Sequence, residues 1–197
     1  MRADSTHREG ALWVPSPEFT AQSRLTAYLD YLQREHNRRF DGYRQLWQWS
    51  VTDLAGFWTS IRDFFDLDIS EPDRVLDAHD GMPHARWFAG ATTNYAANAL
   101  AHRSEGAAIE SLSEDGALTT LTWNELRLRV GALAHWFREQ GVEPGDRIVA
   151  YVPNIPAAVI GLLASAAVGA VWASCAQEYS TDGARDRFAQ LEPRILL

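Results

Sequence analysis

The stretch AAVIGLLASAAVGAVWASCA, residues 157–176, carries no charge in a chain in which 22% of the residues are charged. An apolar run of this length is long enough to cross a bilayer. Pro153 and Pro156, however, predict the start of a helix, and Gly169 with the following Val-Trp pair predicts its end and the start of a strand. Small residues also dominate where a lipid-facing helix would carry Leu, Ile and Phe. We therefore expect a helix followed by a strand, the alternative being an Ala- and Gly-rich spanning helix.

The residues around this stretch predict an alternation of strands and helices from about residue 106 onward. Thr122 stands three residues before Glu125, which is the pattern of a capping box, and the helix that it opens is expected to end at Gly141. A strand in a parallel sheet with helices on both faces is apolar throughout, so a helix and a strand in succession give one uncharged run. The expected elements are a hairpin around Asp115-Gly116, strands at 147–152, 169–175 and 194–197, a helix near 155–168, and a helix with Thr181 as its cap.

The N-terminal half has a different pattern. Residues 16–66 predict helices that each bury one apolar face, formed by Phe19, Leu25, Leu29 and Leu32 and then by Leu54, Phe57, Trp58, Ile61, Phe64 and Phe65. Residues 69–90, rich in Pro, Asp, Gly and His, predict an irregular connection, and a short helix is expected within 94–103. We expect the N-terminal helices to pack around Trp47, Trp49, Trp58 and Trp87, the alternative being an aromatic ligand cage.

Composition excludes several classes of function. The net charge is −8 and no basic run is present, which disfavours a nucleic-acid partner because such a surface needs clustered cations. The polar N-terminus MRADSTHREG does not resemble a secretory signal, and Cys175 is the only cysteine. These features predict a protein of the reducing cytoplasm without an intrachain disulfide. All 18 basic residues are arginine, so no lysine is present to form a Schiff base or to contact a phosphate.

Local motifs for chemistry are scarce. No two glycines lie closer than four positions, so the chain has neither a G-x-G turn nor a P-loop, and it has no G-x-S-x-G elbow. His79 and His84 flank a Gly-Met-Pro turn, and two histidines without a third ligand predict a loop rather than a metal site. Cys175, in an apolar strand, is expected to be a small buried thiol rather than a nucleophile.

Four segments together resemble the N-terminal part of the acetoacetyl-CoA synthetases, a family of adenylate-forming enzymes. They are WQWSVTDLAGFW (47–58), GMPHARWFAGATTNYAANALAHR (81–103), LTWNELRLRVGALAHWFREQGVEPGDRIVAYVPNIPAAVIGLLASAAVGAVWASC (121–175) and DRFAQLEPRILL (186–197). The resemblance covers residues 13–197 in order. It implies an α/β fold, with an N-terminal helical region at 1–105 followed by the start of an AMP-binding large domain at 106–197.

The resemblance also implies a two-step ligase that uses ATP, magnesium and CoA. Acetoacetate would form an acyl-adenylate, and the CoA thiol would then displace AMP. The family's phosphate loop, magnesium-binding acid and late lysine do not occur in this chain, so the resemblance implies an N-terminal part that is inactive alone. Two alternatives stay open, namely another short-chain acyl-CoA synthetase and a non-catalytic binding module.

The resemblance implies a CoA contact at Ala176, Gln177 and Glu178, directly after the strand that ends in VWASC. The family usually has Ser-Pro-Asp-Phe-Gly after the cysteine, whereas this chain has Ala-Gln-Glu-Tyr-Ser, without the proline and the glycine. No catalytic or metal-binding residue is implied within the chain. Because the final strand RILL would leave an edge and a face uncovered, the remainder of the same enzyme or a second copy is the expected partner.

Overall fold

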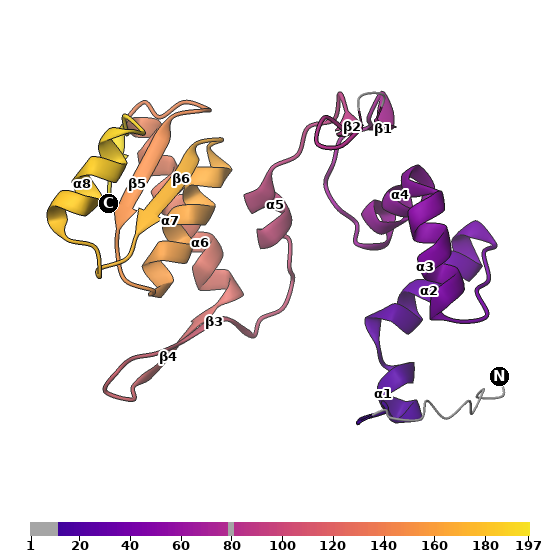
Figure 1. The fold of residues 1–197 in the computed structure, drawn as a ribbon. Coiled ribbons are helices and arrows are strands. Elements are labelled where there is room, and N and C mark those ends of the chain that lie inside the picture. The colour runs from indigo at the N-terminus through magenta and orange to yellow at the C-terminus, as the bar shows by residue number, and fades with distance from the viewer. Residues whose placement is uncertain (1–11, 79–80) are drawn as a thin grey trace. The chain divides into compact units, whose positions relative to one another are not determined.

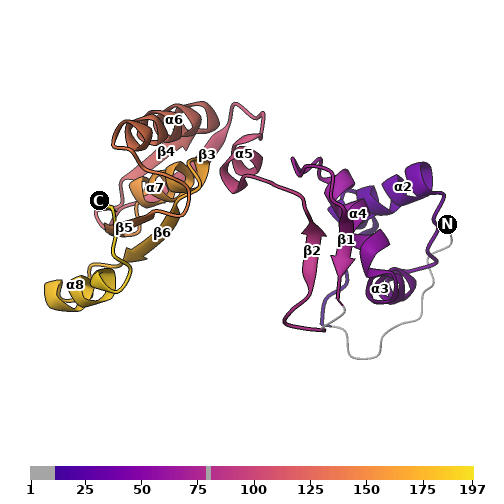
Figure 2. The ribbon, with the colours of Figure 1, turned by 90° about the horizontal axis from the view of Figure 1, so that it is seen from above.

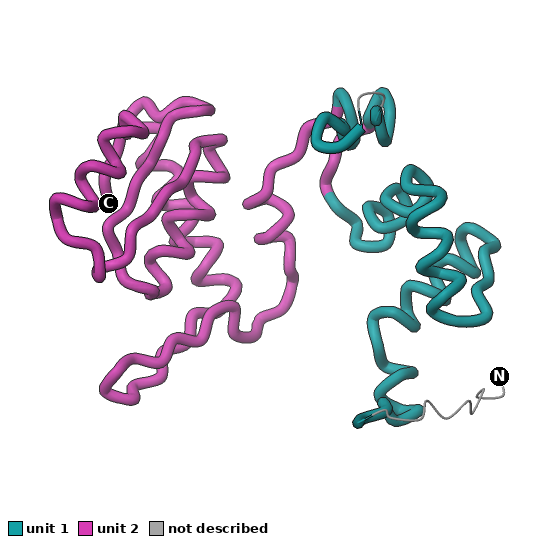
Figure 3. The backbone as a smooth tube through the Cα atoms, in the orientation of Figure 1, with its two compact units in different colours: residues 1–67, 72–90 teal, residues 68–71, 91–197 magenta. Residues whose placement is uncertain are grey.

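A computed structural model describes residues 12–78 and 81–197, which form two compact units (Figure 3). Unit 1 comprises residues 1–67 and 72–90, and unit 2 comprises residues 68–71 and 91–197. Across these described ranges, every helix is too short or too polar to cross a membrane. His79, one of the two histidines considered above, lies outside the described residues.

Unit 1 begins with four helices, α1 (Pro17–Ala21), α2 (Arg24–His36), α3 (Tyr43–Thr52) and α4 (Leu54–Phe64). The side chains of Ser16 and Ser23 cap α1 and α2 by accepting backbone N–H groups, so the two helices are separate. The core of the unit consists of Tyr28, Leu32, Leu46 and Trp49. The helical character expected for residues 16–66 is therefore confirmed.

The expectation of an irregular connection over residues 69–90 is wrong for two short segments. β1 (Arg74–Asp77) pairs antiparallel with β2 (Arg86–Ala89), and Leu76 lies opposite Trp87. Strands of four residues are too short to show a clear alternation of polar and apolar side chains. The Pro, Asp, Gly and His residues around them therefore determined the prediction of an irregular connection.

Three of the four tryptophans expected to pack the N-terminal helices are not buried. Trp49 is buried, whereas Trp47, Trp58 and Trp87 are 49%, 42% and 39% exposed. The rings of Trp58 and Trp87 contact each other edge to face, with centroids 5.7 Å apart. Only Trp49 among these four thus forms part of the helical core.

Unit 2 contains α5 (Tyr95–Leu100), the hairpin β3 (Ala107–Leu112) and β4 (Leu118–Thr122), and then α6 (Trp123–Glu139). The capping box is present, because Thr122 Oγ1 accepts from the N–H of Glu125 and the Glu125 carboxylate accepts from the N–H of Thr122. The backbone and hydroxyl hydrogen bonds from Thr122 lower the pKa of Glu125. The helix is followed by Gly141 with a φ of +70°, as expected.

A three-stranded parallel sheet follows, formed by β5 (Arg147–Tyr151), β6 (Val171–Cys175) and β7 (Ile195–Leu196) in the order β6-β5-β7. The chain passes from β5 to β6 through α7 (Pro156–Ala167), and from β6 to β7 through α8 (Thr181–Ala189). Helices α6 and α7 cover one face and α8 covers the other (Figures 1 and 2). Ile148 and Val149, both fully buried, belong to the two opposite cores.

The uncharged stretch at 157–176 is thus a helix and a strand that pack against each other. Gly169, with a φ of +77°, lies in the turn between α7 and β6. Gly161 on α7 faces Trp172 on β6 so closely that a Cβ atom at position 161 would lie 2.5 Å from the indole carbon Cη2. The expected strand–helix–strand order is confirmed.

The expected cap of α8 is off by one residue. Ser180, which has an extended backbone, accepts a hydrogen bond from the N–H of Gly183, and Thr181 is the first residue of the helix. Ser ranks above Thr as a helix cap, and Ser180 directly precedes Thr181 in the sequence.

Candidate functional site: the carboxyl edge of the parallel sheet

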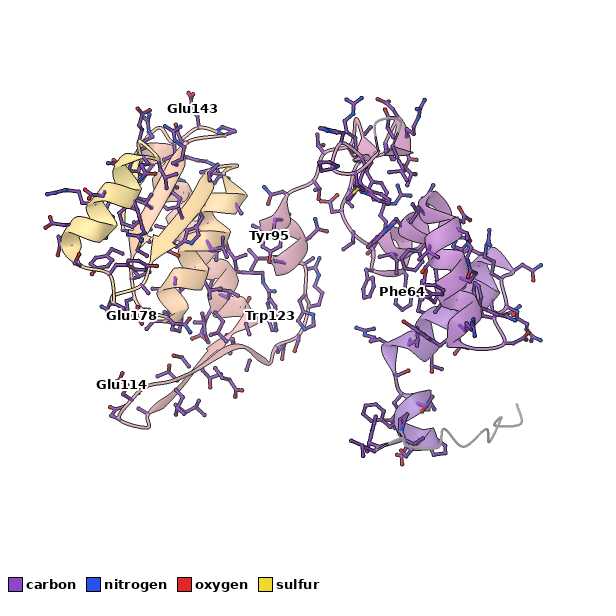
Figure 4. All side chains as sticks on the ribbon, viewed as in Figure 1. Phe64, Tyr95, Glu114, Trp123, Glu143 and Glu178 are labelled. Carbon is purple, nitrogen blue, oxygen red and sulfur yellow. The ribbon has the colours of Figure 1, made fainter. Side chains whose placement is uncertain are left out.

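The three parallel strands of unit 2 end at one edge of their sheet. In α/β folds, ligands bind outside the carboxyl ends of the strands, between two neighbouring strands whose following connections lead to opposite faces of the sheet. β5 and β6 are such a pair, because β5 is followed by α7 on one face and β6 is followed by α8 on the other. Figure 4 shows Glu178 at this edge and Glu143 at the opposite edge. The fold thus brings the predicted CoA contact to the edge at which such sheets bind ligands.

The three residues predicted to contact CoA lie in the turn 176–180, which joins β6 to α8. Ala176, Gln177 and Glu178 are all exposed. The backbone N–H of Tyr179 donates to the carbonyl of Ala176 at 3.3 Å, which closes the turn. The side chains of Gln177 and Glu178 make no hydrogen bond or ion pair within the described part of the chain, so both are available to a ligand.

Two residues that sequence reasoning missed hold this turn. The hydroxyl of Tyr151, at the end of β5, donates to the carbonyl of Tyr179 at 2.5 Å and lies 3.3 Å from the carbonyl of Gln177. The guanidinium of Arg187 on α8 lies 4.2 Å from the centre of the Tyr179 ring, which is a cation–π contact. Strand alternation places Tyr151 on the same face as Val149. No local sequence pattern, however, indicates that the Tyr151 hydroxyl donates to a carbonyl 28 residues later.

The side chains of this turn suit some parts of CoA and not others. The Gln177 amide both donates and accepts hydrogen bonds, whereas the Glu178 carboxylate only accepts them. Such a pair fits amide N–H groups and exocyclic amines, which occur in the pantetheine arm and the adenine of CoA. A carboxylate repels phosphate, so the turn does not fit the phosphate groups of CoA.

The described residues do not fit a magnesium–triphosphate group. Within residues 12–78 and 81–197, no three His, Cys, Asp or Glu side chains come together as a metal site. The sequence also contains no lysine and no glycine-rich phosphate loop. Cys175 is buried in the core between the sheet and α8, as expected for a structural thiol.

Two hollows of unit 2 lie away from the predicted turn. One of about 410 Å³ lies at the amino edge of the sheet, where Arg138, Pro144 and Gly169 are among its lining residues. Another of about 190 Å³ lies between β3 and the start of α7, with Leu112, Asn154 and Val159 in its wall. The turn 176–180 is exposed and lines neither of these two hollows.

Two family models match the chain. A model described as AMP-binding enzyme matches residues 96–197, and one described as Acetyl-coenzyme A synthetase N-terminus matches residues 43–99.

Individual relatives agree with these models. The chain is 34% identical over 189 residues to an acetoacetyl-coenzyme A synthetase of Rhizobium meliloti (strain 1021), covering 96% of this chain and 29% of the relative. It is 33% identical over 196 residues to a malonamoyl-CoA synthetase of Penicillium aethiopicum, covering 95% of this chain and 27% of that protein.

A solved structure is similar over almost the same range. The acetoacetyl-CoA synthetase from Streptomyces lividans superposes with a TM-score of 0.85 at 42% identity, covering 93% of this chain and 29% of that one. The chain therefore spans less than a third of the length of each of these relatives.

Proposed function

The chain belongs to the AMP-binding enzyme family, and on that premise we propose that the polypeptide of which it forms the N-terminal part is an AMP-forming acid–thiol ligase that converts acetoacetate and CoA to acetoacetyl-CoA. The observation that carries this proposal is the likeness to the Streptomyces lividans acetoacetyl-CoA synthetase, at 42% identity over 93% of the chain. The division into an N-terminal helical region at 1–105 and the start of the large domain at 106–197 is part of the same proposal. The single, buried cysteine agrees with a reducing cytoplasm as its compartment.

The proposed reaction has two steps. A carboxylate oxygen of acetoacetate attacks the α-phosphorus of ATP, and pyrophosphate leaves. The CoA thiol then loses its proton and attacks the acyl carbon, and AMP leaves with the electron pair of the broken C–O bond. Both steps bring anions together, so the catalytic machinery has to neutralise and orient them. The described residues offer no site for magnesium and triphosphate, and we assign those roles to the rest of the polypeptide.

This chain contributes one side of the CoA site in the proposed enzyme. Gln177 and Glu178 would bind amide or amine groups of CoA at the carboxyl edge of the sheet, and Ala176 would line the turn without a polar contact. The phosphates of CoA would meet cations elsewhere, because the Glu178 carboxylate disfavours them.

The test is a product analysis of the full-length polypeptide with ATP, magnesium, CoA and acetoacetate. We expect acetoacetate-dependent AMP and acetoacetyl-CoA, both identified by mass spectrometry, and no ADP. The 197-residue chain alone, which has no lysine, is the matched control and should release no acetoacetate-dependent pyrophosphate. ADP in place of AMP would contradict the proposed reaction class.

A second candidate is a ligase for another short acid. The similarity to a malonamoyl-CoA synthetase and the altered turn Ala-Gln-Glu-Tyr-Ser favour it. A panel of acetate, malonamate and acetoacetate separates the candidates by the ratio of kcat to KM. AMP formation with malonamate alone would support the second candidate, and no AMP with any acid would favour a non-catalytic binding module.

A further inference from the structure

The turn proposed to contact CoA lacks the residues that usually fix the backbone of a turn. Proline presets one backbone dihedral and glycine allows left-handed conformations, so the two commonly define turn geometry. Residues 176–180 contain neither. Because all five residues are exposed, the core does not hold them by burial either.

Tyr151 is placed to supply the missing restraint. Its hydroxyl carries one hydrogen, which is directed at the carbonyl of Tyr179, while the 3.3 Å approach to the Gln177 carbonyl is a weaker second contact. The two acceptors flank Glu178 along the chain. One side chain thus holds the backbone on both sides of a residue proposed to meet CoA.

The backbone of Tyr151 connects the other two strand ends. Its N–H donates to the carbonyl of Leu197 at 3.0 Å, directly after β7, and it lies opposite Cys175 in the β5–β6 register. Tyr151 therefore contacts the carboxyl ends of β6 and β7 as well as the turn. Its ring is half-buried against the core that contains Val149 and Phe188, which limits the positions that the hydroxyl can reach.

Arg187 restrains the same turn through the side chain of Tyr179. Its guanidinium lies over the Tyr179 ring and its Nη1 donates to the carbonyl of Gly183 at 3.0 Å, which fixes the guanidinium within α8. The main chain of Tyr179 is thus held by Tyr151 and its side chain by Arg187. Neither contact uses Gln177 or Glu178 side-chain atoms, which stay available to a ligand.

We propose that Tyr151 is a positioning residue for CoA, acting with Arg187 to hold the turn 176–180 in its ligand-binding conformation. This inference rests on the proposed function, because it concerns the CoA site of that ligase. It predicts that the hydroxyl of Tyr151 affects the thioester-forming step and not the adenylate-forming step.

The test compares Tyr151→Phe with Tyr95→Phe in the full-length polypeptide. Tyr95 is 67% exposed on α5, and its hydroxyl has no partner among the described residues, so its loss controls for the change from tyrosine to phenylalanine. For Tyr151→Phe we expect the KM for CoA to rise about two- to tenfold, the range given by the loss of one hydrogen bond. The KM values for ATP and acetoacetate and the rate of acid-dependent pyrophosphate exchange should stay unchanged.

Amide hydrogen exchange on the same variants separates the two proposals. Tyr151→Phe should speed exchange at the Tyr179 N–H, which donates to the carbonyl of Ala176, and Arg187→Ala should act in the same direction. An unchanged KM for CoA in an active Tyr151→Phe enzyme, or an equal loss in both half-reactions, would overturn the positioning role alone. A wild-type enzyme that forms no thioester would contradict the proposed function and this role with it, while the exchange data would still report whether Tyr151 restrains the turn.

Discussion

Replacing Gly161 with alanine tests the packing that divides the 157–176 stretch into a helix and a strand. A Cβ at position 161 would lie 2.5 Å from Cη2 and 2.7 Å from Cζ3 of Trp172, well inside van der Waals contact. The indole is rigid and belongs to the packed core, so either α7 or β6 has to shift. Overpacking of this kind costs about 1–3 kcal/mol.

The matched control is Gly131→Ala on α6. A Cβ at position 131 meets no atom within 4 Å, and the residue lies in the middle of an exposed helical face. Alanine is more favourable than glycine in a helix interior by about 1 kcal/mol, and this gain applies to both positions. We therefore expect Gly131→Ala to stabilise by about 1 kcal/mol and Gly161→Ala to destabilise by up to about 2 kcal/mol.

Urea unfolding measures the difference, with the transition of unit 2 assigned by hydrogen exchange. With an m-value of about 2 kcal/mol/M, a difference of about 2 kcal/mol separates the two midpoints by about 1 M. If residues 157–176 were one continuous helix, positions 161 and 172 would lie about 16 Å apart along its axis and could not clash. Equal stabilisation by both substitutions would refute the packing argument.

Three further outcomes follow from other contacts. Thr122→Ala removes the capping box of α6 and should destabilise unit 2 by about 1 kcal/mol in the same urea assay, whereas Thr122→Ser should be near neutral. Hydrogen bonds from the Trp49 indole and the Gly56 N–H, aided by the charge of Arg38, lower the pKa of Asp53. The ionised Asp53 carboxylate therefore stabilises unit 1 fully at pH values above the ordinary carboxyl pKa. This stabilisation is lost as the pH falls through the lowered pKa of Asp53 in the folded state. Asp53→Asn keeps a capping side chain and should weaken the fall in the free energy of unfolding at acid pH. An unchanged fall would contradict the role of the Asp53 carboxylate. Leu196 on β7 is 64% exposed, so we expect the 197-residue chain to self-associate at low micromolar concentration in a sedimentation experiment. Leu196→Glu should reduce this self-association. A sharp monomer peak for the unchanged chain would argue against association through β7.

The features that the sequence predicted well depend on local patterns. Two such patterns combine a specific residue with a change of hydrophobic period, namely the capping box of Thr122 and Glu125 and the apolar run that contains Gly169. The structure contains the capping box, and Gly169 lies in the turn between the helix and the strand. The hairpin of β1 and β2 was missed because its strands are only four residues long. The exposure of Trp47 and Trp58 was missed because helical spacing shows which residues share a face, and not whether another element covers that face.

The candidate site was likewise predicted only in part from the sequence. The resemblance located the turn at Ala176, Gln177 and Glu178, and the parallel strand order places that turn at the carboxyl edge. The contacts of Tyr151 with this turn span 26 and 28 residues, and they depend on the register of β5 against β6. A short stretch of sequence does not reveal the register between two strands, so these contacts could be identified only in the structure.

Amide hydrogen exchange of the full-length polypeptide with and without saturating CoA shows directly whether the carboxyl edge of the β6-β5-β7 sheet forms part of a CoA site. We expect slower exchange at residues 177–180 when CoA is bound. The exposed hairpin turn at residues 113–117 serves as the internal reference and should be unchanged. Bound CoA, verified by a thermal shift of the same sample, with no change in exchange at residues 177–180 would contradict a CoA site at this edge.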